Sequence, residues 1–218
     1  MSHCTYQTVY NPANAPSARF FAGLGITAGM RVLDVGCGNG DLSRFIAGLA
    51  GPGGDVVAID RSEDALAIAR ATAMAPHAAP VRYCRAELAS ELPDFGNFDA
   101  IVGRRVLMYL PDCAAALARL ARLAKPGAIL AFQEHARAGL PAGLGVLALH
   151  RQLYDWVWST VSAEGGDAGL ALRLVDLMQA IGFTIERRGA KGCCYSPASR
   201  RSCHRLPEPC CRVSSSAG

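Results

Sequence analysis

Residues 31–40 decide the fold, and they read RVLDVGCGNG. The first half, 31–35, contains Val32, Leu33 and Val35, and such a short β-rich run that is ended by glycines is typical of a buried strand. Glycines then occupy positions 36, 38 and 40, directly before a helical pattern that starts at Asp41. Glycine permits a tight turn in which the backbone approaches a ligand closely. The stretch therefore predicts a strand, a ligand-binding turn and a helix, in that order.

Outward from this stretch, short β-rich runs alternate with helical patterns. The pattern predicts helices over residues 41–50, 62–74, 112–125, 143–162 and 167–181. It predicts further strands over residues 55–60, 81–85, 98–103, 128–134 and 183–187. Such alternation favours the α/β class, with a doubly wound, mostly parallel sheet that has helices on both faces. Ligands of such sheets bind at the carboxyl ends of the strands, where the glycine turn lies.

Two carboxylates accompany the turn. Asp60 ends the second predicted strand, about 20 residues after the glycines, where a carboxylate can hydrogen-bond both hydroxyls of a ribose. Asp34 stands two residues before the first glycine. A carboxylate there would repel a pyrophosphate but could hold an ammonium group. Nicotinamide and flavin folds prefer G-x-G-x-x-G, whereas this chain has G-x-G-x-G, so a phosphate-free, zwitterionic nucleoside is favoured.

Four ordered segments resemble the class I S-adenosylmethionine-dependent methyltransferases. They are VLDVGCGNG at 32–40, VAID at 57–60, GNFDAIVGRRVLMYL at 96–110 and LAKPGAILAF at 123–132. The resemblance covers roughly residues 19–186 and is to the bacterial small-molecule type, similar to the ubiquinone and menaquinone biosynthesis group. It implies S-adenosylmethionine as the cofactor and a small-molecule methyl acceptor.

The resemblance also implies where the cofactor binds. Residues at the methionine and ribose portion would be Asp34, Gly36, Gly38 and Gly40, and the ribose hydroxyls would be bound by Asp60. The adenine would lie beside Arg61, Ala86 and Glu87, and the floor of the site would be formed by Gly103 and Arg104. Arg85 departs from the family, which often has an acid there that accepts the adenine amino group. Either Glu87 or a backbone carbonyl takes that role, or affinity is reduced.

No motif specifies a catalytic base, so the catalytic residues are left unassigned. His135 could serve as a base, or it could form a satisfied polar pair with Glu134. Arg104 and Arg105 could be solvated charges instead of cofactor contacts. The aromatic residues Tyr154, Trp156 and Trp158 could line a substrate pocket or belong to the core.

The predicted organisation has three parts. Residues 1–18 are an N-terminal lid, in which Tyr6 and Tyr10 would lie, or a disordered segment. Residues 19–188 are the methyltransferase domain, in which 136–181 form a helical insertion that shapes the substrate pocket. Residues 189–218 are irregular.

The basic charge of the chain is concentrated at its end. Seven of the 22 basic residues but only one of the 18 acidic residues lie in 187–218, so residues 1–186 carry 15 basic and 17 acidic side chains. A basic nucleic-acid-binding face is therefore not expected. No run of about 18 apolar residues exists, so we expect no membrane span. The polar start, without an export signal, and the scattered cysteines of residues 1–186 favour a cytoplasmic protein with reduced thiols.

Five of the nine cysteines fall in the last 26 residues. Cys193, Cys194, Cys203, Cys210 and Cys211, with His204, could form a metal cluster. Adjacent cysteines without a C-x-x-C pair suit one tetrahedral site poorly, so we expect no metal. An altered or frame-shifted C-terminus is the preferred interpretation. Since this family ends with two antiparallel strands and only 183–187 is recognisable, the C-terminal edge strand is expected to be missing.

The sequence therefore predicts methyl transfer to a small molecule by direct displacement at the sulfonium. The alternatives are a non-catalytic or impaired cofactor-binding homologue and a protein or RNA methyltransferase. A dehydrogenase is more distant. The acceptor and the oligomeric state are not predicted.

Overall fold

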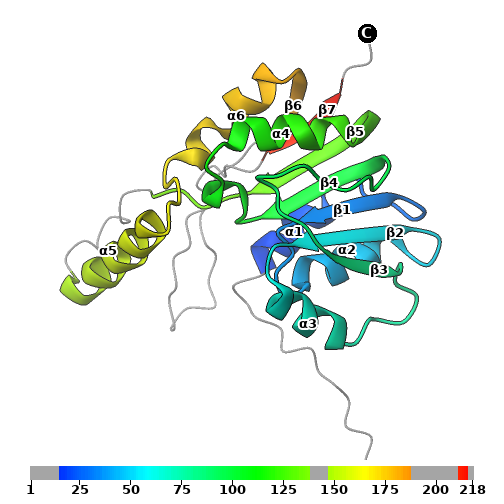
Figure 1. Ribbon diagram of the computed structural model, residues 1–218, viewed down its shortest axis with the longest axis horizontal. Helices are drawn as coiled ribbons and strands as arrows, with labels where there is room; N and C mark the ends of the chain where they lie inside the picture. The colour runs from blue at the N-terminus through cyan, green and yellow to red at the C-terminus, as the bar shows by residue number, and fades with distance from the viewer. Residues whose placement is uncertain (1–14, 138–146, 188–210, 216–218) are drawn as a thin grey trace, which may run out of the picture.

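The computed structural model describes residues 15–137, 147–187 and 211–215, and these form one seven-stranded sheet with the order β3-β2-β1-β4-β5-β7-β6 (Figure 1). The strands are β1 Arg31–Val35, β2 Asp55–Asp60, β3 Val81–Arg85, β4 Phe98–Arg104, β5 Ala124–Gln133, β6 Phe183–Arg187 and β7 Cys211–Ser215. Strands β1 to β5 run parallel, and β7 is antiparallel to both of its neighbours. The predicted doubly wound, mostly parallel sheet is confirmed.

Helices cover both faces of the sheet (Figure 1). They are α1 Ala15–Ala22, α2 Asp41–Ala50, α3 Glu63–Ala71, α4 Cys113–Arg122, α5 Ala148–Ala163 and α6 Leu170–Ala180, and a short 3-10 helix, η2, spans Leu107–Tyr109. Alternate residues of β1 separate two cores, because successive side chains of a strand point to opposite faces. Val32 packs with α1 and α2, whereas Leu33 and Val35 pack with α4 and α6.

The expectation that the last strand is missing was wrong. Strand β7, at Cys211–Ser215, lies between β5 and β6 instead of at the edge, and β6 forms the edge of the sheet. Its register pairs Val213 with Leu130 on one side and with Ile185 on the other. The short, polar composition of this segment conceals the strand, since its position depends on partners far away in the chain.

Several boundaries also differ from the prediction. Helix α3 ends at Ala71, before the predicted Met74, and its first turn is capped by the Ser62 hydroxyl, which accepts from the amide of Ala65. Strand β5 begins at Ala124, earlier than predicted, and contains the Pro126-Gly127 breaker. The register between β4 and β5 shifts at this point, from Phe98–Ala124 to Ala100–Ile129. The breaker therefore makes an irregularity in a strand instead of an end to it.

Helix α5 projects from the body of the molecule (Figure 1). Trp158 is buried, whereas Leu149, Leu153, Trp156 and Val157 are exposed. No helix in the described part of the chain is long and apolar enough to cross a membrane.

Candidate functional site

The candidate site lies at the carboxyl ends of the parallel strands, where the strand order reverses. Strands β2 and β3 lie on one side of β1, and β4 and β5 lie on the other. The segments that follow β1 and β4 therefore diverge to opposite faces of the sheet and leave a crevice between them, which is where ligands bind in open α/β sheets.

The sequence predicted a tight turn after β1, and the glycines of this turn have a left-handed backbone. At Gly36, φ is 65°, and a Cβ there would lie 2.3 Å from Cγ2 of Val106, in the segment after β4. At Gly38, φ is 52°, and a Cβ would meet no atom within 4 Å. Gly36 is therefore required by packing across the crevice, whereas Gly38 faces open space that a bound molecule could occupy.

Asp60 joins the glycine turn to the end of β2. Its Oδ2 accepts from the amide of Gly38 at 2.8 Å, and its Oδ1 accepts from the amide of Ser62 at 2.9 Å. The Asp60 side chain is half-buried, so the carboxylate is held in one orientation and still reaches the crevice. The rigid orientation suits a carboxylate that receives two neighbouring hydroxyls.

Asp34 is buried beneath the glycine turn, with a relative exposure of 1%. Its Oδ2 accepts from the Ser43 hydroxyl at 2.6 Å, whereas Oδ1 has no hydrogen-bond partner within the described parts of the chain. Burial raises the pKa of Asp34 to about 7, and this rise is opposed by the Ser43 hydroxyl and by Arg104. A buried carboxylate oxygen without a donor costs free energy unless a ligand supplies one.

Five of the predicted cofactor residues meet at one pocket. This pocket has a volume of about 380 Å³, and the residues are Gly36, Asp60, Arg61, Ala86 and Glu87. They come from the ends of three neighbouring strands, β1, β2 and β3. The convergence depends on the parallel order, because parallel strands end at the same edge.

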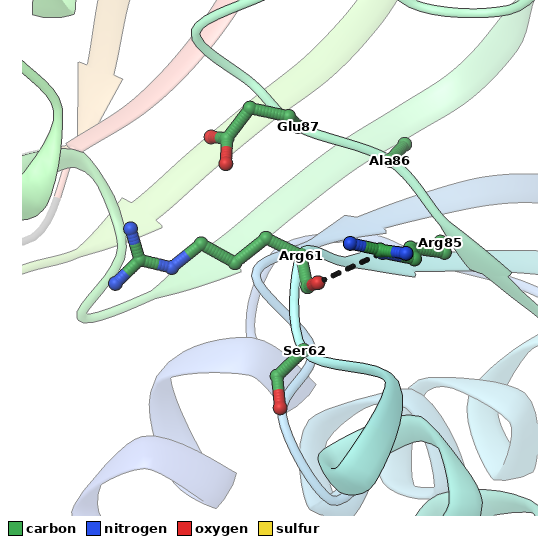
Figure 2. Close-up of a pocket in the computed structure, with 5 residues that line it drawn as sticks. All are labelled: Arg61, Ser62, Arg85, Ala86 and Glu87. Carbon is green, nitrogen blue, oxygen red and sulfur yellow. Dashed lines mark hydrogen bonds between the residues drawn. The ribbon is translucent and has the colours of Figure 1, made fainter.

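A larger, open pocket of about 620 Å³ adjoins the first beyond β2 and β3. It is lined by Arg61, Ser62, Arg85, Ala86 and Glu87, and Figure 2 shows the directions of their side chains. The Nε of Arg85 donates to the carbonyl oxygen of Arg61 at 3.3 Å. In the same view the carboxylate of Glu87 points away from Arg85. Glu87 therefore remains a candidate acceptor for an amino group, and Arg85 lies against the backbone instead.

The other predicted residues lie behind this surface or in the sheet. Gly40 continues the turn with φ 80°, and a Cβ there would lie 2.6 Å from the Tyr83 hydroxyl oxygen. A Cβ at Gly103 would lie 2.9 Å from the side chains of Phe132 and Val35, so this glycine is required by packing of the sheet. Arg104 is half-buried and interacts electrostatically with Asp34.

Of the wall opposite Asp60, the sequence suggested only Arg105, as one of two alternatives, and the other residues were not predicted. Arg105, Val106, Tyr109, Leu110 and Pro111, all from the segment after β4, line the smaller pocket, and Leu88 and Ala89 complete it. Arg105 has a left-handed φ of 57°, an uncommon conformation for a residue other than glycine. The only signal in the sequence is position, since these residues directly follow a strand that ends at the crevice.

The polar residues at the end of β5 have different environments. Glu134 is buried and accepts hydrogen bonds from the backbone amides of Val106, Leu107 and Met108. His135 keeps an exposed surface, but the part of its ring that faces the protein is desolvated, and this desolvation lowers its pKa together with the nearby charges of Arg105 and Arg104. Glu134 is therefore satisfied by the backbone, and His135 is neutral near pH 7.

The aromatic residues of α5 divide between core and surface. Trp158 is buried in the core and packs edge-to-face on Tyr154, with ring centroids 6.2 Å apart, whereas Trp156 is exposed. None of the three lines the pockets described above.

Cys37, Cys84 and Cys113 are free thiols, as predicted for the body of the chain. Residues Tyr6 and Tyr10 of the predicted lid and the tail residues Cys193, Cys194, Cys203, His204 and Cys210 lie outside the described residues.

The sequence of this chain is similar to that of known methyltransferases. A family model described as a methyltransferase domain matches residues 26–169. The ubiquinone biosynthesis O-methyltransferase of Alkalilimnicola ehrlichii is 40% identical over 111 residues, which cover 50% of this chain and 43% of that protein. The chain therefore spans less than half the length of this curated relative.

Solved structures share the fold. The crystal structure of an S-adenosylmethionine-dependent methyltransferase from Aquifex aeolicus has a TM-score of 0.63 and 20% identity, and covers 94% of this chain and 92% of that one. The crystal structure of the [4+2]-cyclase SpnF has a TM-score of 0.58 and 26% identity, and covers 79% of this chain and 58% of that one. The same fold thus carries more than one chemistry, so function has to be argued from the site.

Proposed function

The chain belongs to the class I S-adenosylmethionine-dependent methyltransferases, and from that premise we propose that its crevice binds the cofactor and directs its methyl group to a small-molecule acceptor. The observation that carries the proposal is the convergence of Gly36, Asp60 and Glu87, from three strands, on one pocket.

The chemistry of the site suits the cofactor. The unpartnered Oδ1 of Asp34 would accept from the ammonium group of the methionine portion, and the open space at Gly38 leaves room for the backbone to approach it. Asp60 would bind the ribose hydroxyls. The carboxylate of Asp60 disfavours a pyrophosphate and favours a cationic sulfonium, and a bound ammonium group would stabilise the charged form of Asp34. These assignments extend the predicted site residues and remain proposals.

The adenine end would lie between Arg61, Ala86 and Glu87, which line both pockets. Arg85 donates to the Arg61 carbonyl and offers no acceptor for an amino group, so Glu87 is the side chain that would take this role. Gly103 and Arg104 would support the floor, Gly103 through packing and Arg104 through its charge beside Asp34.

When bound, the cofactor would supply an activated methyl group: the acceptor would form a bond to the methyl carbon as the bond from carbon to sulfur breaks and the neutral thioether leaves. The contribution of the protein is then alignment and exclusion of water. A hydroxyl acceptor also requires a base. His135 is a candidate because its lowered pKa keeps it neutral near pH 7, and it follows Glu134 at the end of β5.

Residues 136–181 include α5 and α6, and we propose that this insertion bounds the acceptor site. A ubiquinone biosynthesis O-methyltransferase is among the relatives, which supports a small-molecule acceptor. Three predictions from the sequence remain predictions. They are the domain boundaries at residues 18 and 188, a cytoplasmic location and the lack of nucleic-acid partners.

Calorimetric titration with S-adenosylmethionine and S-adenosylhomocysteine tests the cofactor site. We expect the full chain to bind both S-adenosylmethionine and S-adenosylhomocysteine and not to bind NAD. Asp60→Ala should weaken binding by at least about ten-fold, because a charged acceptor of two hydroxyls is lost.

Asp64→Ala is the matched control, since Asp64 is an exposed carboxylate on the neighbouring helix α3 and lines neither pocket. It should bind as the wild type does. A folded wild-type protein that binds neither ligand would overturn the proposal. Binding without turnover on any acceptor would favour the impaired homologue instead.

A further inference from the structure

Glu134 connects the end of β5 to the pocket wall after β4. It directly follows β5, and its relative exposure is 6%. Its Oε1 accepts from the amides of Val106 at 3.0 Å and Leu107 at 2.9 Å, and its Oε2 lies 3.5 Å from the amide of Met108. These amides begin the 3-10 helix η2, where backbone donors lack partners within the helix.

The segment that Glu134 holds also forms the wall of the smaller pocket. Arg105, Val106 and Tyr109 line that pocket. Val106 fills the space beside Gly36, so a shift of its backbone would move the side chain against the glycine turn or away from it. The left-handed conformation of Arg105 directly precedes the held amides, and such a conformation persists only where surrounding contacts impose it.

The opposite side of the same segment is attached to the helical insertion. The carbonyl oxygen of Met108 accepts from the amide of Asp167 at 2.7 Å, and the side chains of Leu107 and Met108 are buried in the core. Because these contacts do not involve Glu134, loss of the carboxylate should loosen the start of η2 without unfolding it.

Glu134 is poorly placed to react with an acceptor itself. Its oxygens are engaged by backbone donors, and the side chain is almost completely buried. Burial raises the pKa of Glu134 to about 7, while the amides of Leu107, Val106 and Met108 lower it. The Glu134 carboxyl can therefore be charged or protonated near pH 7. In either state the backbone amides need one of its oxygens as their acceptor.

We infer that Glu134 is a positioning residue, which holds the Arg105–Tyr109 wall at the distance from Gly36 that the bound cofactor requires. The inference rests on the proposed function, since it assigns a role toward the same pocket. It also makes a claim about the unliganded chain, because the held amides should be protected whether or not a ligand is present.

The test uses two substitutions, one that changes only the charge of the Glu134 side chain and one that changes only its length. Glu134→Gln keeps an acceptor oxygen at the same distance without the charge, and Glu134→Asp keeps the charge but withdraws it by one methylene. We expect Glu134→Gln to bind S-adenosylhomocysteine within about three-fold of the wild type, and Glu134→Asp and Glu134→Ala to bind at least about ten-fold more weakly.

Amide hydrogen exchange, measured by NMR without ligand, gives a readout that is independent of binding. The amides of Val106 and Leu107 should exchange faster in Glu134→Asp than in the wild type and in Glu134→Gln. If Glu134→Ala fails to fold, Glu134→Asp and Glu134→Gln still decide the question.

Asp99→Ala is the matched control, because the Asp99 carboxylate also accepts from a backbone amide, that of Arg31 at 2.8 Å. It lies at the amino end of the sheet, so its loss should lower stability and leave the dissociation constant unchanged. Unchanged binding and exchange in Glu134→Asp, or equal weakening in Glu134→Gln and Glu134→Asp, would overturn the inference. A wild type that does not bind would instead contradict the proposed function, and the exchange rates would still test Glu134.

Discussion

At the scale of single residues, the two acidic side chains of the glycine-turn region differ in how they are satisfied. Asp60 accepts from two backbone amides and is half-buried, whereas Asp34 is buried with one oxygen lacking a donor among the described residues. Both positions were predicted from the sequence as cofactor ligands. The difference in burial required the structure, because it depends on Ser43 and on the helix packed over Asp34.

We predict that Asp34→Asn changes how stability depends on pH. Burial raises the pKa of Asp34 from 3.8 to about 7, so the folded protein keeps a proton that the unfolded chain has released. The stability associated with that proton is complete below pH 3.8 and is lost as the pH rises to 7. Asparagine carries no such penalty, so the variant should be more stable at pH 8 by up to about 4 kcal/mol.

Urea unfolding at pH 4 and pH 8 measures this difference, which should be small at pH 4. Asp64→Asn, in an exposed position, is the control and should show no such dependence. Equal destabilisation of Asp34→Asn at both pH values would contradict the expected linkage.

At the scale of elements, the boundaries follow the sequence where local signals are complete. Helix α2 and strands β1, β2, β3 and β6 have the predicted bounds, because glycine, the breaker turns and apolar periodicity mark both ends. Helix η2 was not predicted. The backbone amides at its start donate to Glu134, a residue 26 positions away from Met108.

Helix α5 provides a test at this scale, because two tryptophans two residues apart differ in burial. Trp158 has a relative exposure of 7%, and Trp156 of 61%. Trp158→Ala should reduce the free energy of unfolding by about 3–5 kcal/mol, because it leaves a cavity between α5 and the core. Trp156→Ala should change it by less than about 0.5 kcal/mol.

Chemical denaturation of both variants gives the comparison directly. Similar losses in the two would mean that α5 packs differently from the arrangement in Figure 1.

At the scale of the whole molecule, the last strand, β7, lies between β5 and β6 and pairs with both of them. Truncation after Arg187 removes β7 and leaves both neighbouring strands without their antiparallel partner. We expect the truncated chain to lose at least about 3 kcal/mol of stability and to self-associate, since unpaired strand edges template further pairing.

Urea unfolding and sedimentation velocity test this expectation against a chain that ends at Ser215, which keeps β7. A truncated chain that is monomeric and as stable as this control would show that the terminal strand contributes nothing to the sheet. The interpretation of the C-terminus as altered would then gain support.

The sequence alone determined the fold class and half of the pocket. Alternating strands and helices and the glycine spacing are local patterns, and parallel strands necessarily bring their carboxyl ends together, so Gly36, Asp60 and Glu87 converge. Tertiary structure alone decided the other wall, the anchoring of that wall by Glu134, and the pairing of β7. Each of these features joins residues that are distant in the chain. The free energy of such contacts depends on both partners, so no hydrophobic periodicity in the sequence indicates them.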